Sequence, residues 1–471
     1  LAVNLGFALN YRVADVEVFF IPAFLLTALL LAAGLDAIAR ALSRALSRTR
    51  VSAPHWAARG FAHLSTYAHT LMLVFLLLPL WLARANYDRV DLSHNWDIRD
   101  YGRDILSQPL PGNSTLIGIQ GEMSLLQYFQ DTQGLRPDVQ TIAADREPAR
   151  LAAIDRALGQ NRSVFLTRPL AGAPQKYALT SFGPLIQVQA VPNTVAAPSP
   201  QHPSDEDFQG VRFLGYDLDA SRLQDGANWH LSSGRKLRVT LYWHVESKIK
   251  NDRLVSLKLL GPNGELGAQL DLHPVLDAYP TTAWRVGEYI SDTYDLPVLM
   301  GAAPGDYTLQ ATLYDPQSGV VYGQKAMEKI TLAPDTQMRP PQLFDVERHV
   351  TRDFGGAVLV GYALDSADGY QAGDDIPITL LWRVASDQPR QLELTLRDNS
   401  YTVITNQPLT VPANHITGGQ YVRQQLTLSI PSPAPPDPLR IELDTAPRDA
   451  LACDLPLFSP CITLGQVRIG K

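Results

Sequence analysis

The chain has 471 residues, of which 18% are charged, and a formal net charge of −7. This length exceeds what a single core needs, so three or more domains are expected. No basic stripe runs along the sequence, which argues against a nucleic-acid partner, and the frequent glycines and prolines (32 and 35 residues) favour turn-rich β structure over a helical bundle.

Two apolar spans near the amino end, at about residues 18–38 and 64–84, are each long enough to cross a bilayer core of about 30 Å as a helix. An arginine-rich loop joins them, with no lysine or acidic residue between Arg40 and Arg59. The positive-inside rule places this loop in the cytoplasm. Residues 1–95 are therefore expected to form a membrane segment with two transmembrane helices, and residues after about 86 to lie outside the cytoplasm, in a multi-pass protein of the cell membrane. The alternative is a pair of buried helices in a soluble protein.

The residues before the first span carry two acidic side chains. No cationic segment of the signal-peptide kind precedes the apolar run, so residues 1–17 are interpreted as the outer end of a membrane helix and the chain as a fragment without its first membrane helices. Asp15 and Glu17 would lie at the outer membrane edge, where they are candidates for a catalytic or lipid-phosphate site. An ordinary helix start with acids in its first turn is the preferred interpretation.

Residues 96–191 alternate helical and strand patterns, which predicts a small three-layer α/β domain with a mainly parallel sheet. Helices are expected at 97–107, 122–133 and 147–158, and strands at 115–119, 139–143, 163–167 and 185–191. The turn Ile119-Gln120-Gly121-Glu122 follows a strand and opens a helix, where such folds bind ligands. Without a GxGxxG or P-loop pattern, a structural turn is preferred there to a nucleotide site. Residues 192–207 are rich in proline, serine and acids and are expected to be a linker.

The rest of the chain is an internal repeat. The sequence FLGYDLD from Phe213 matches LVGYALD from Leu359, an offset of 359 − 213 = 146, and GRKLRVTLYWHVES from Gly234 matches GDDIPITLLWRVAS from Gly373. Two antiparallel β-sandwiches, immunoglobulin-like or jelly-roll, are predicted at residues 208–334 and 335–471. Apolar residues alternate in the repeated strand, which places Trp243 and Trp382 on its buried face.

One loop-like segment of the first copy has a tryptophan that the second copy lacks. Tyr279, Trp284 and Arg285 are candidate carbohydrate-binding residues, because an exposed aromatic ring can stack on a sugar. A tryptophan that caps the end of the sandwich is the preferred interpretation. Three acids, Asp271, Asp277 and Asp292, flank the segment; they suggest structural calcium only weakly, because their spacing fits no calcium loop, and surface acids are preferred.

The two cysteines, Cys453 and Cys461, both lie near the carboxyl end. In an oxidising compartment they could form a disulfide that closes a short loop. The alternative is two free, partly buried thiols. No metal-type spacing of cysteine and histidine surrounds them, so neither a metal site nor a cofactor is expected.

Several segments resemble a known family. The stretch NYRVADVEVFFIP from Asn10, the second apolar span, LIGIQGE from Leu116, Tyr128 and RPDV from Arg136 are similar to the carboxyl-terminal part of a bacterial family of multi-pass membrane proteins of unassigned domain type. That family is related to protein O-mannosyltransferases and other glycosyltransferases of the GT-C class. The β segments look like sandwich modules attached to such enzymes. Gly121-Glu122 stands where the family often has Gly-Asp, a mild departure.

The resemblance implies the carboxyl-terminal fragment of a membrane glycosyltransferase that takes its sugar from a polyprenyl-phosphate donor. The soluble domains would position a glycan or protein acceptor outside the cytoplasm, close to membrane lipids. The catalytic carboxylate of this class is expected in an outer loop upstream of the chain, so no catalytic residue is transferred; Asp15 falls on a family motif position of unassigned role. The alternative function is a non-enzymatic, membrane-anchored surface protein whose sandwiches bind carbohydrate or protein.

Overall fold

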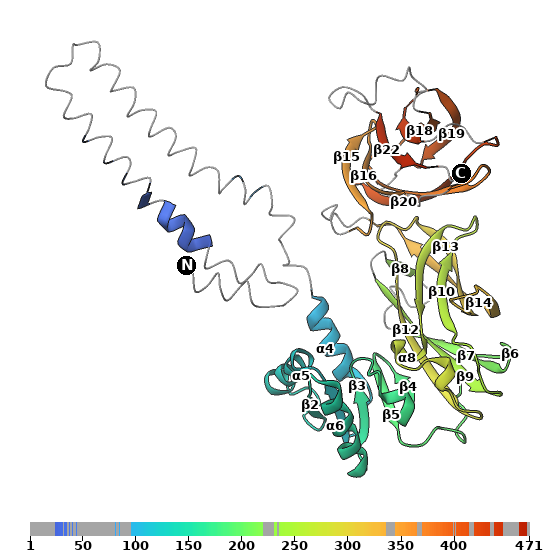
Figure 1. Cartoon of the computed structure of the whole chain (residues 1–471). Coiled ribbons are helices and arrows are strands. Elements are labelled where there is room, and N and C mark those ends of the chain that lie inside the picture. The colour runs from blue at the N-terminus through green and yellow to red at the C-terminus, as the bar shows by residue number, and fades with distance from the viewer. Residues whose placement is uncertain are drawn as a thin grey trace. The chain divides into compact units, whose positions relative to one another are not determined.

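The computed structural model divides the chain into two compact units, residues 1–91 and 92–471. It describes residues 24–31, 33, 34, 37, 40, 44, 81, 84, 96–219, 230–232, 235–335, 344–364, 370–398, 400, 402–413, 419–433, 438–445 and 461–468. The described residues of the first unit are helical. The described residues of the second unit lie mostly in β-strands, which form five sheets (Figure 1).

The predicted fold class is wrong in its two transmembrane helices. In the described part of the chain, no helix has both the length and the apolar character needed to cross a bilayer. Residues 24–31 of the first predicted span are described and are helical. The other residues of the spans, apart from 33, 34, 37, 81 and 84, lie outside the described residues, and so does most of the arginine-rich loop.

The α/β domain has a mixed sheet, here called sheet A, with strand order β2-β1-β3-β5-β4. Strands β1, β2 and β3 are parallel, whereas β5 is antiparallel to both β3 and β4. Two of the four strand pairings are therefore parallel, fewer than the mainly parallel sheet predicts, because β4 and β5 form an antiparallel hairpin at one edge. The elements are α4 (Asp97–Ser107), β1 (Ser114–Gly118), α5 (Gln120–Gln133), β2 (Gln140–Ala143), α6 (Glu147–Gly159), β3 (Ser163–Leu166), α7 (Ala173–Lys176), β4 (Ala178–Phe182) and β5 (Leu185–Gln189).

Helices cover both faces of sheet A. Neighbouring residues of a strand point to opposite faces, so each face has apolar side chains that a helix buries. Leu116 of β1 packs in one cluster with Ile105 of α4 and Leu126 of α5. Ile117, the next residue, packs in another cluster with Ile154 of α6. That second cluster continues without interruption into the first β-sandwich, so the two domains share one core.

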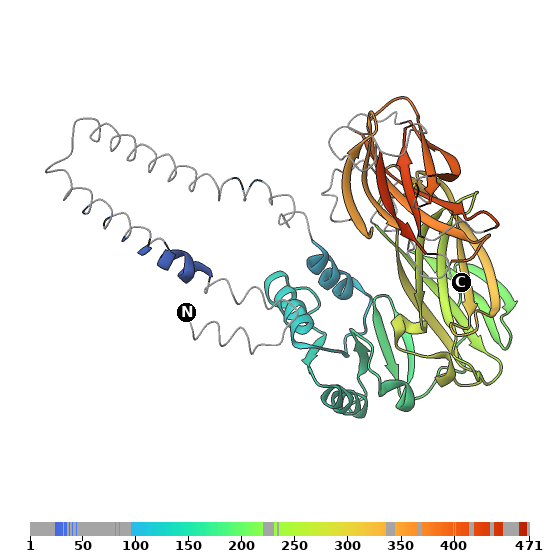
Figure 2. The same ribbon diagram turned by 45° about the horizontal axis from the view of Figure 1, so that its top comes forward.

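Each β-sandwich consists of two packed sheets (Figures 1 and 2). Sandwich 1 comprises sheet B, in the order β12-β9-β7-β6, and sheet C, in the order β11-β10-β13-β14-β8. Its elements are β6 (His202–Asp207), β7 (Val211–Leu218), β8 (His230–Ser232), β9 (Lys236–Val245), β10 (Leu254–Leu260), β11 (Leu266–Leu272), α8 (Pro274–Asp277), η3 (Thr281–Ala283), β12 (Tyr289–Pro297), β13 (Gly305–Tyr314) and β14 (Val321–Ala333).

Sandwich 2 comprises sheet D, in the order β15-β16-β17-β20, and sheet E, in the order β19-β18-β21-β22. Its strands are β15 (Arg348–Asp353), β16 (Ala357–Leu364), β17 (Asp375–Val384), β18 (Arg390–Arg397), β19 (Val403–Val411), β20 (Gln420–Ser429), β21 (Leu439–Asp444) and β22 (Ile462–Val467). The order matches that of sandwich 1 strand by strand, apart from β8. In both sandwiches the chain passes from one sheet to the other through Greek-key connections, as in immunoglobulin-like domains.

The expected core positions of the repeated tryptophans are confirmed, since Trp243 and Trp382 are fully buried. The expected linker is wrong in its second half. Residues 202–207 form β6, an antiparallel partner of β7, because alternate residues of this polar segment still pack on the sandwich. Pro203 is compatible with the strand because β6 lies at the edge of sheet B.

Candidate functional site

The site residues predicted from sequence fall into two groups. Asp15 and Glu17 lie outside the described residues. Tyr279 and Trp284 are described and fully buried, so neither ring can serve as the expected sugar-stacking platform. The Tyr279 hydroxyl donates to the Glu288 carboxylate at 3.1 Å, and the Trp284 indole donates to the Tyr279 carbonyl oxygen at 3.2 Å. Arg285 is half-buried beside them, and its backbone N–H donates to Glu288 at 3.1 Å.

The segment between β11 and β12 holds an unusual backbone turn. Val275, Leu276 and Asp277 all have positive φ, at 59°, 57° and 66°. This left-handed conformation costs about 1–2 kcal/mol per residue, and for a β-branched valine it is a true outlier. The Asp292 carboxylate on β12 accepts the Val275 backbone N–H at 2.6 Å. A buried carboxylate therefore holds the strained turn against the sandwich.

Asp292 lies in the core of sandwich 1. Its carboxylate also accepts the Trp243 indole N–H at 3.1 Å and the Tyr294 hydroxyl at 2.7 Å. Burial raises the pKa of Asp292 to about 7, although these donors favour the charged form. The preferred sequence interpretation of Asp292 as a surface acid is wrong, because its side chain points with Trp243 into the core.

His273 joins two loops at the same end of the sandwich. One ring nitrogen contacts Asp252 at 2.6 Å and the other contacts Asp277 at 2.8 Å. Burial lowers the pKa of His273, but the two carboxylates outweigh it, so the pKa is raised overall. The remaining acid of the calcium hypothesis, Asp271, instead accepts a hydrogen bond from Tyr314. Among the described residues no group of acids, histidines and cysteines could hold a metal ion.

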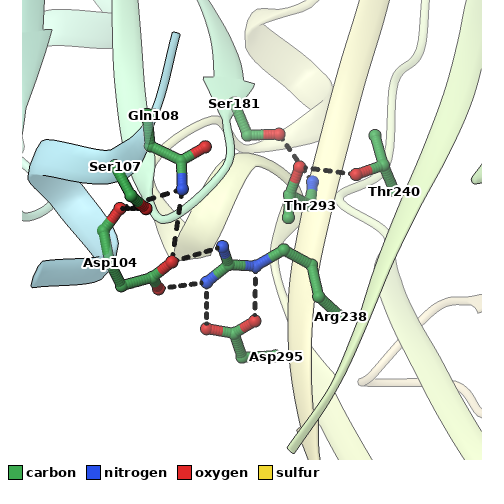
Figure 3. A network of polar contacts seen from close by, with 8 residues as sticks. All are labelled: Asp104, Ser107, Gln108, Ser181, Arg238, Thr240, Thr293 and Asp295. Atoms are coloured by element: carbon green, nitrogen blue, oxygen red, sulfur yellow. Dashed lines mark hydrogen bonds and ion pairs between the residues drawn. The ribbon is translucent and has the colours of Figure 1, made fainter. Parts of the chain in front are cut away.

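The junction between the α/β domain and sandwich 1 centres on Arg238 of β9 (Figure 3). Its guanidinium forms a two-pronged pair with Asp295 of β12, with both distances at 2.7 Å. It forms a second pair with Asp104 of α4, at 3.1 and 2.7 Å. Only 7% of the Arg238 side chain is exposed. Burial lowers its pKa, but the two carboxylates outweigh burial and raise the pKa above its ordinary value.

Hydroxyl groups complete the junction, among them that of Ser181 next to Thr293 (Figure 3). Thr180 of β4 accepts the Ser291 backbone N–H at 2.9 Å, and Ser181 accepts the Thr293 backbone N–H at 2.5 Å. Both hydroxyls also donate to the Ser291 carbonyl oxygen, at 3.0 and 2.8 Å. Strand β12 is the edge of sheet B, so these side chains satisfy backbone groups that an edge strand otherwise leaves open. The junction therefore fixes the two domains against one another.

The turn at the start of α5 has fewer backbone N–H groups open to a ligand than its position after a strand suggests. Glu122 accepts the Ile119 backbone N–H at 3.3 Å and the Thr167 hydroxyl at 2.6 Å, and pairs with Arg168 at 3.2 Å. Asp145 accepts the Gln120 backbone N–H at 2.8 Å. Helix N-termini bind anions through such N–H groups, and here the chain's own carboxylates occupy two of them. The preferred interpretation as a structural turn agrees with this geometry.

Sequence reasoning missed the junction residues. Alternation placed Arg238 on the outer face of its strand, but the α/β domain covers that face. Comparison of the two copies does single out Arg238, because Pro377 stands at the equivalent position of the second copy. Nothing in the sequence pairs either position with Asp104, which lies 134 residues before Arg238.

No family model matches the chain, and no curated protein matches it. Among solved structures, a DUF4785 family protein from Legionella pneumophila is 13% identical with a TM-score of 0.16, and the alignment covers 55% of each chain. Alpha-2-macroglobulin from E. coli is 11% identical over 56% of this chain and 15% of that one, with a TM-score of 0.15. Dimeric latent PorU from Porphyromonas gingivalis is 9% identical over 61% and 22%, with a TM-score of 0.16. The chain thus spans about half or less of the length of these proteins, and the low scores carry no functional argument.

Proposed function

We propose that the second unit positions a glycan or protein acceptor for a glycosyltransferase that uses a polyprenyl-phosphate sugar outside the cytoplasm. The observation that carries the proposal is the junction at Arg238, which joins the α/β domain and sandwich 1 through buried ion pairs. Positioning needs such rigidity, because a loosely held acceptor loses the orientation that accelerates transfer. The transferase chemistry comes from elsewhere, and the sequence resemblance is what points to its class.

The extracytoplasmic location draws support from the carboxyl end. Cys461 is disulfide-bonded; Cys453, the other cysteine of the chain, lies outside the described residues. Disulfides persist in secreted and extracytoplasmic proteins and are rare in the reducing cytoplasm. This agrees with the compartment in which lipid-linked sugars would be transferred.

Sugar transfer in membranes tests the proposal. Membranes that contain the whole protein are incubated with radiolabelled polyprenyl-phosphate mannose, and the label that reaches protein or glycan is measured. The variant Asp104→Asn removes one charge from the pair between the domains and leaves Arg238 paired with Asp295. We expect it to lower the transfer rate severalfold. Asp100→Asn is the matched control on the same helix, because Asp100 pairs only with its neighbour Arg99 among the ion pairs of the described residues.

Two results would contradict the proposal. Transfer that is the same with and without the protein would favour the alternative, a surface protein that only binds. Equal rates for Asp104→Asn and Asp100→Asn would show that the junction does not matter for transfer. The alternative cannot rest on stacking at Trp284, because that ring is fully buried.

A further inference from the structure

The outer face of sheet C carries a polar surface that is separate from the junction at Arg238. Two rows of side chains cross it. One row runs Asp271, Ser256, Thr312 and Gln324, and the next runs Gln269, Lys258, Gln310 and Ala326. Ser256 belongs to this face because its neighbours Val255 and Leu257 point into the core. Apart from Ser256, every side chain in the two rows is half-exposed or exposed.

Ser256 lies at the centre of this face and is 4% exposed. Within the described part of the chain its hydroxyl has no hydrogen-bond partner. A buried hydroxyl without a partner costs about 1–3 kcal/mol, so such a group in a folded protein calls for an explanation. The hydroxyl points toward the outer face, where a ligand could supply the missing partner.

A hydrogen bond spans the strand that carries this hydroxyl. Tyr314 on β13 donates to Asp271 on β11 at 3.2 Å. These strands flank β10 on its two sides, so the bond passes over β10, where Ser256 lies in register with Asp271. Tyr314 is itself half-exposed. Its ring can therefore swing outward without leaving a hole in the core.

The charge and the hydrogen-bonding groups of the face indicate which kind of ligand it can bind. Lys258 and Asp271 are the charged members of the two rows, so their charges cancel. Nucleic acid requires a clear excess of positive charge, and a peptide helix requires an apolar groove. Amides and hydroxyls both donate and accept hydrogen bonds, as sugar hydroxyls do, and a tyrosine ring offers an apolar surface with a polar tip.

We propose that the outer face of sheet C binds a neutral oligosaccharide, with Ser256, Asp271 and Tyr314 at the centre of the site. A sugar hydroxyl replaces the Tyr314 hydroxyl on Asp271 and supplies the partner that Ser256 lacks, while the displaced ring packs beside the sugar. The site deepens the proposed function, on which it rests for its role, by giving the glycan a place on sandwich 1. Binding here needs no transferase and no lipid-linked donor, so binding can fail while transfer persists, and the reverse.

Direct binding by the whole protein tests the site. The purified protein is applied to an array of neutral oligosaccharides of glucose, mannose, galactose and N-acetylglucosamine, and the best binder is titrated calorimetrically. Ser256→Ala is expected to weaken binding roughly threefold to tenfold, the loss of about one hydrogen bond. Asp271→Asn should weaken it by a similar factor. Tyr314→Phe should bind as tightly as the unaltered protein or more tightly, because phenylalanine has no hydroxyl group to compete for Asp271.

The repeat provides a matched control. Asn406 lies in register with Thr395 in sheet E, as Asp271 lies in register with Ser256, and Asn406→Ala should leave binding unchanged. Ser256→Ala removes one atom, and an unchanged circular dichroism spectrum and melting temperature show that it folds. Absence of binding to every oligosaccharide would overturn the proposal. So would affinities that Ser256→Ala and Asp271→Asn leave unaltered, or an affinity that falls in Tyr314→Phe.

Discussion

At the scale of single residues, the equivalent tryptophans of the two sandwiches differ in their hydrogen bonds. The Trp243 indole N–H donates to Asp292, whereas the Trp382 indole N–H has no partner among the described residues. The alternating pattern was enough to place both rings in the core. It could not reveal Asp292, because a carboxylate on a strand is ordinarily assigned to the surface. Its carboxylate accepts a hydrogen bond from the strained turn at Val275, which no local pattern indicates.

Replacing each tryptophan by phenylalanine separates the two environments. Trp243→Phe should destabilise sandwich 1 by about 1–2 kcal/mol more than Trp382→Phe destabilises sandwich 2, because a buried carboxylate then loses a donor. Native-state hydrogen exchange of the amides in β9 and β17 measures each sandwich separately. Equal losses would show that the indole bond to Asp292 contributes nothing.

The pKa of Asp292 makes the stability of sandwich 1 depend on pH. Its folded pKa of about 7 exceeds the unfolded value of about 3.9, so the folded state binds the proton more tightly. The free energy of unfolding should therefore fall as pH rises from about 4 to about 7, by roughly 4 kcal/mol at 1.36 kcal/mol per pKa unit. Asp292→Asn should remove most of this slope. A variant with the same slope as the unaltered protein would contradict the assignment.

His273 also makes the free energy of unfolding fall as pH rises. A variant of His273 separates its contribution from that of Asp292. The raised pKa of His273 means that its stabilisation is complete below the unfolded pKa of about 6.5 and is lost as pH rises through the folded value. His273→Gln should therefore flatten the stability profile only above about pH 6.5. The part of the profile that belongs to Asp292 should remain.

At the scale of elements, the repeat extends further than the matched sequences showed. The Phe208 N–H donates to the Val211 carbonyl oxygen at 2.8 Å, and the Phe354 N–H donates to that of Ala357 at 2.9 Å. Gly210 and Gly356 both have positive φ, at 88° and 95°. The signal was present in the sequence, since these hairpins keep the offset of 356 − 210 = 146. It was missed because only three residues connect the strands of each hairpin and the first strands, β6 and β15, lack an apolar run.

The hairpin between β6 and β7 should be sensitive to its glycine. A Cβ atom at Gly210 would lie 2.0 Å from the Ser247 hydroxyl oxygen, and the residue has a φ of 88°. Gly210→Ala should therefore cost more than the about 1 kcal/mol expected from backbone strain alone. Gly264→Ala is the control, because Gly264 has a φ of 87° and open space around its Cβ position. Hydrogen exchange in β7 should rise more for the first variant, and equal exchange would count against the close contact.

At the scale of the whole second unit, each sandwich contacts the domain before it through the outer face of its first sheet. Sheet B contacts the α/β domain through Arg238 and Thr293. Sheet D contacts sandwich 1 through Arg423, which donates to the Met300 carbonyl oxygen at 3.3 Å, and through Leu381, whose cluster includes Met300. Domain types and the repeat could be predicted from local patterns. These junctions could not, because they pair outer-face residues across more than 100 positions of sequence.

The central claim is that the α/β domain and sandwich 1 form one rigid body held at Arg238. Spin labels at exposed positions of the two domains, Gln127→Cys and Lys329→Cys, allow their separation to be measured by pulsed electron paramagnetic resonance. We expect one narrow distance distribution, which broadens in Asp104→Asn and stays narrow in Asp100→Asn. A broad distribution in the unaltered protein, or a narrow one that Asp104→Asn leaves unchanged, would contradict it.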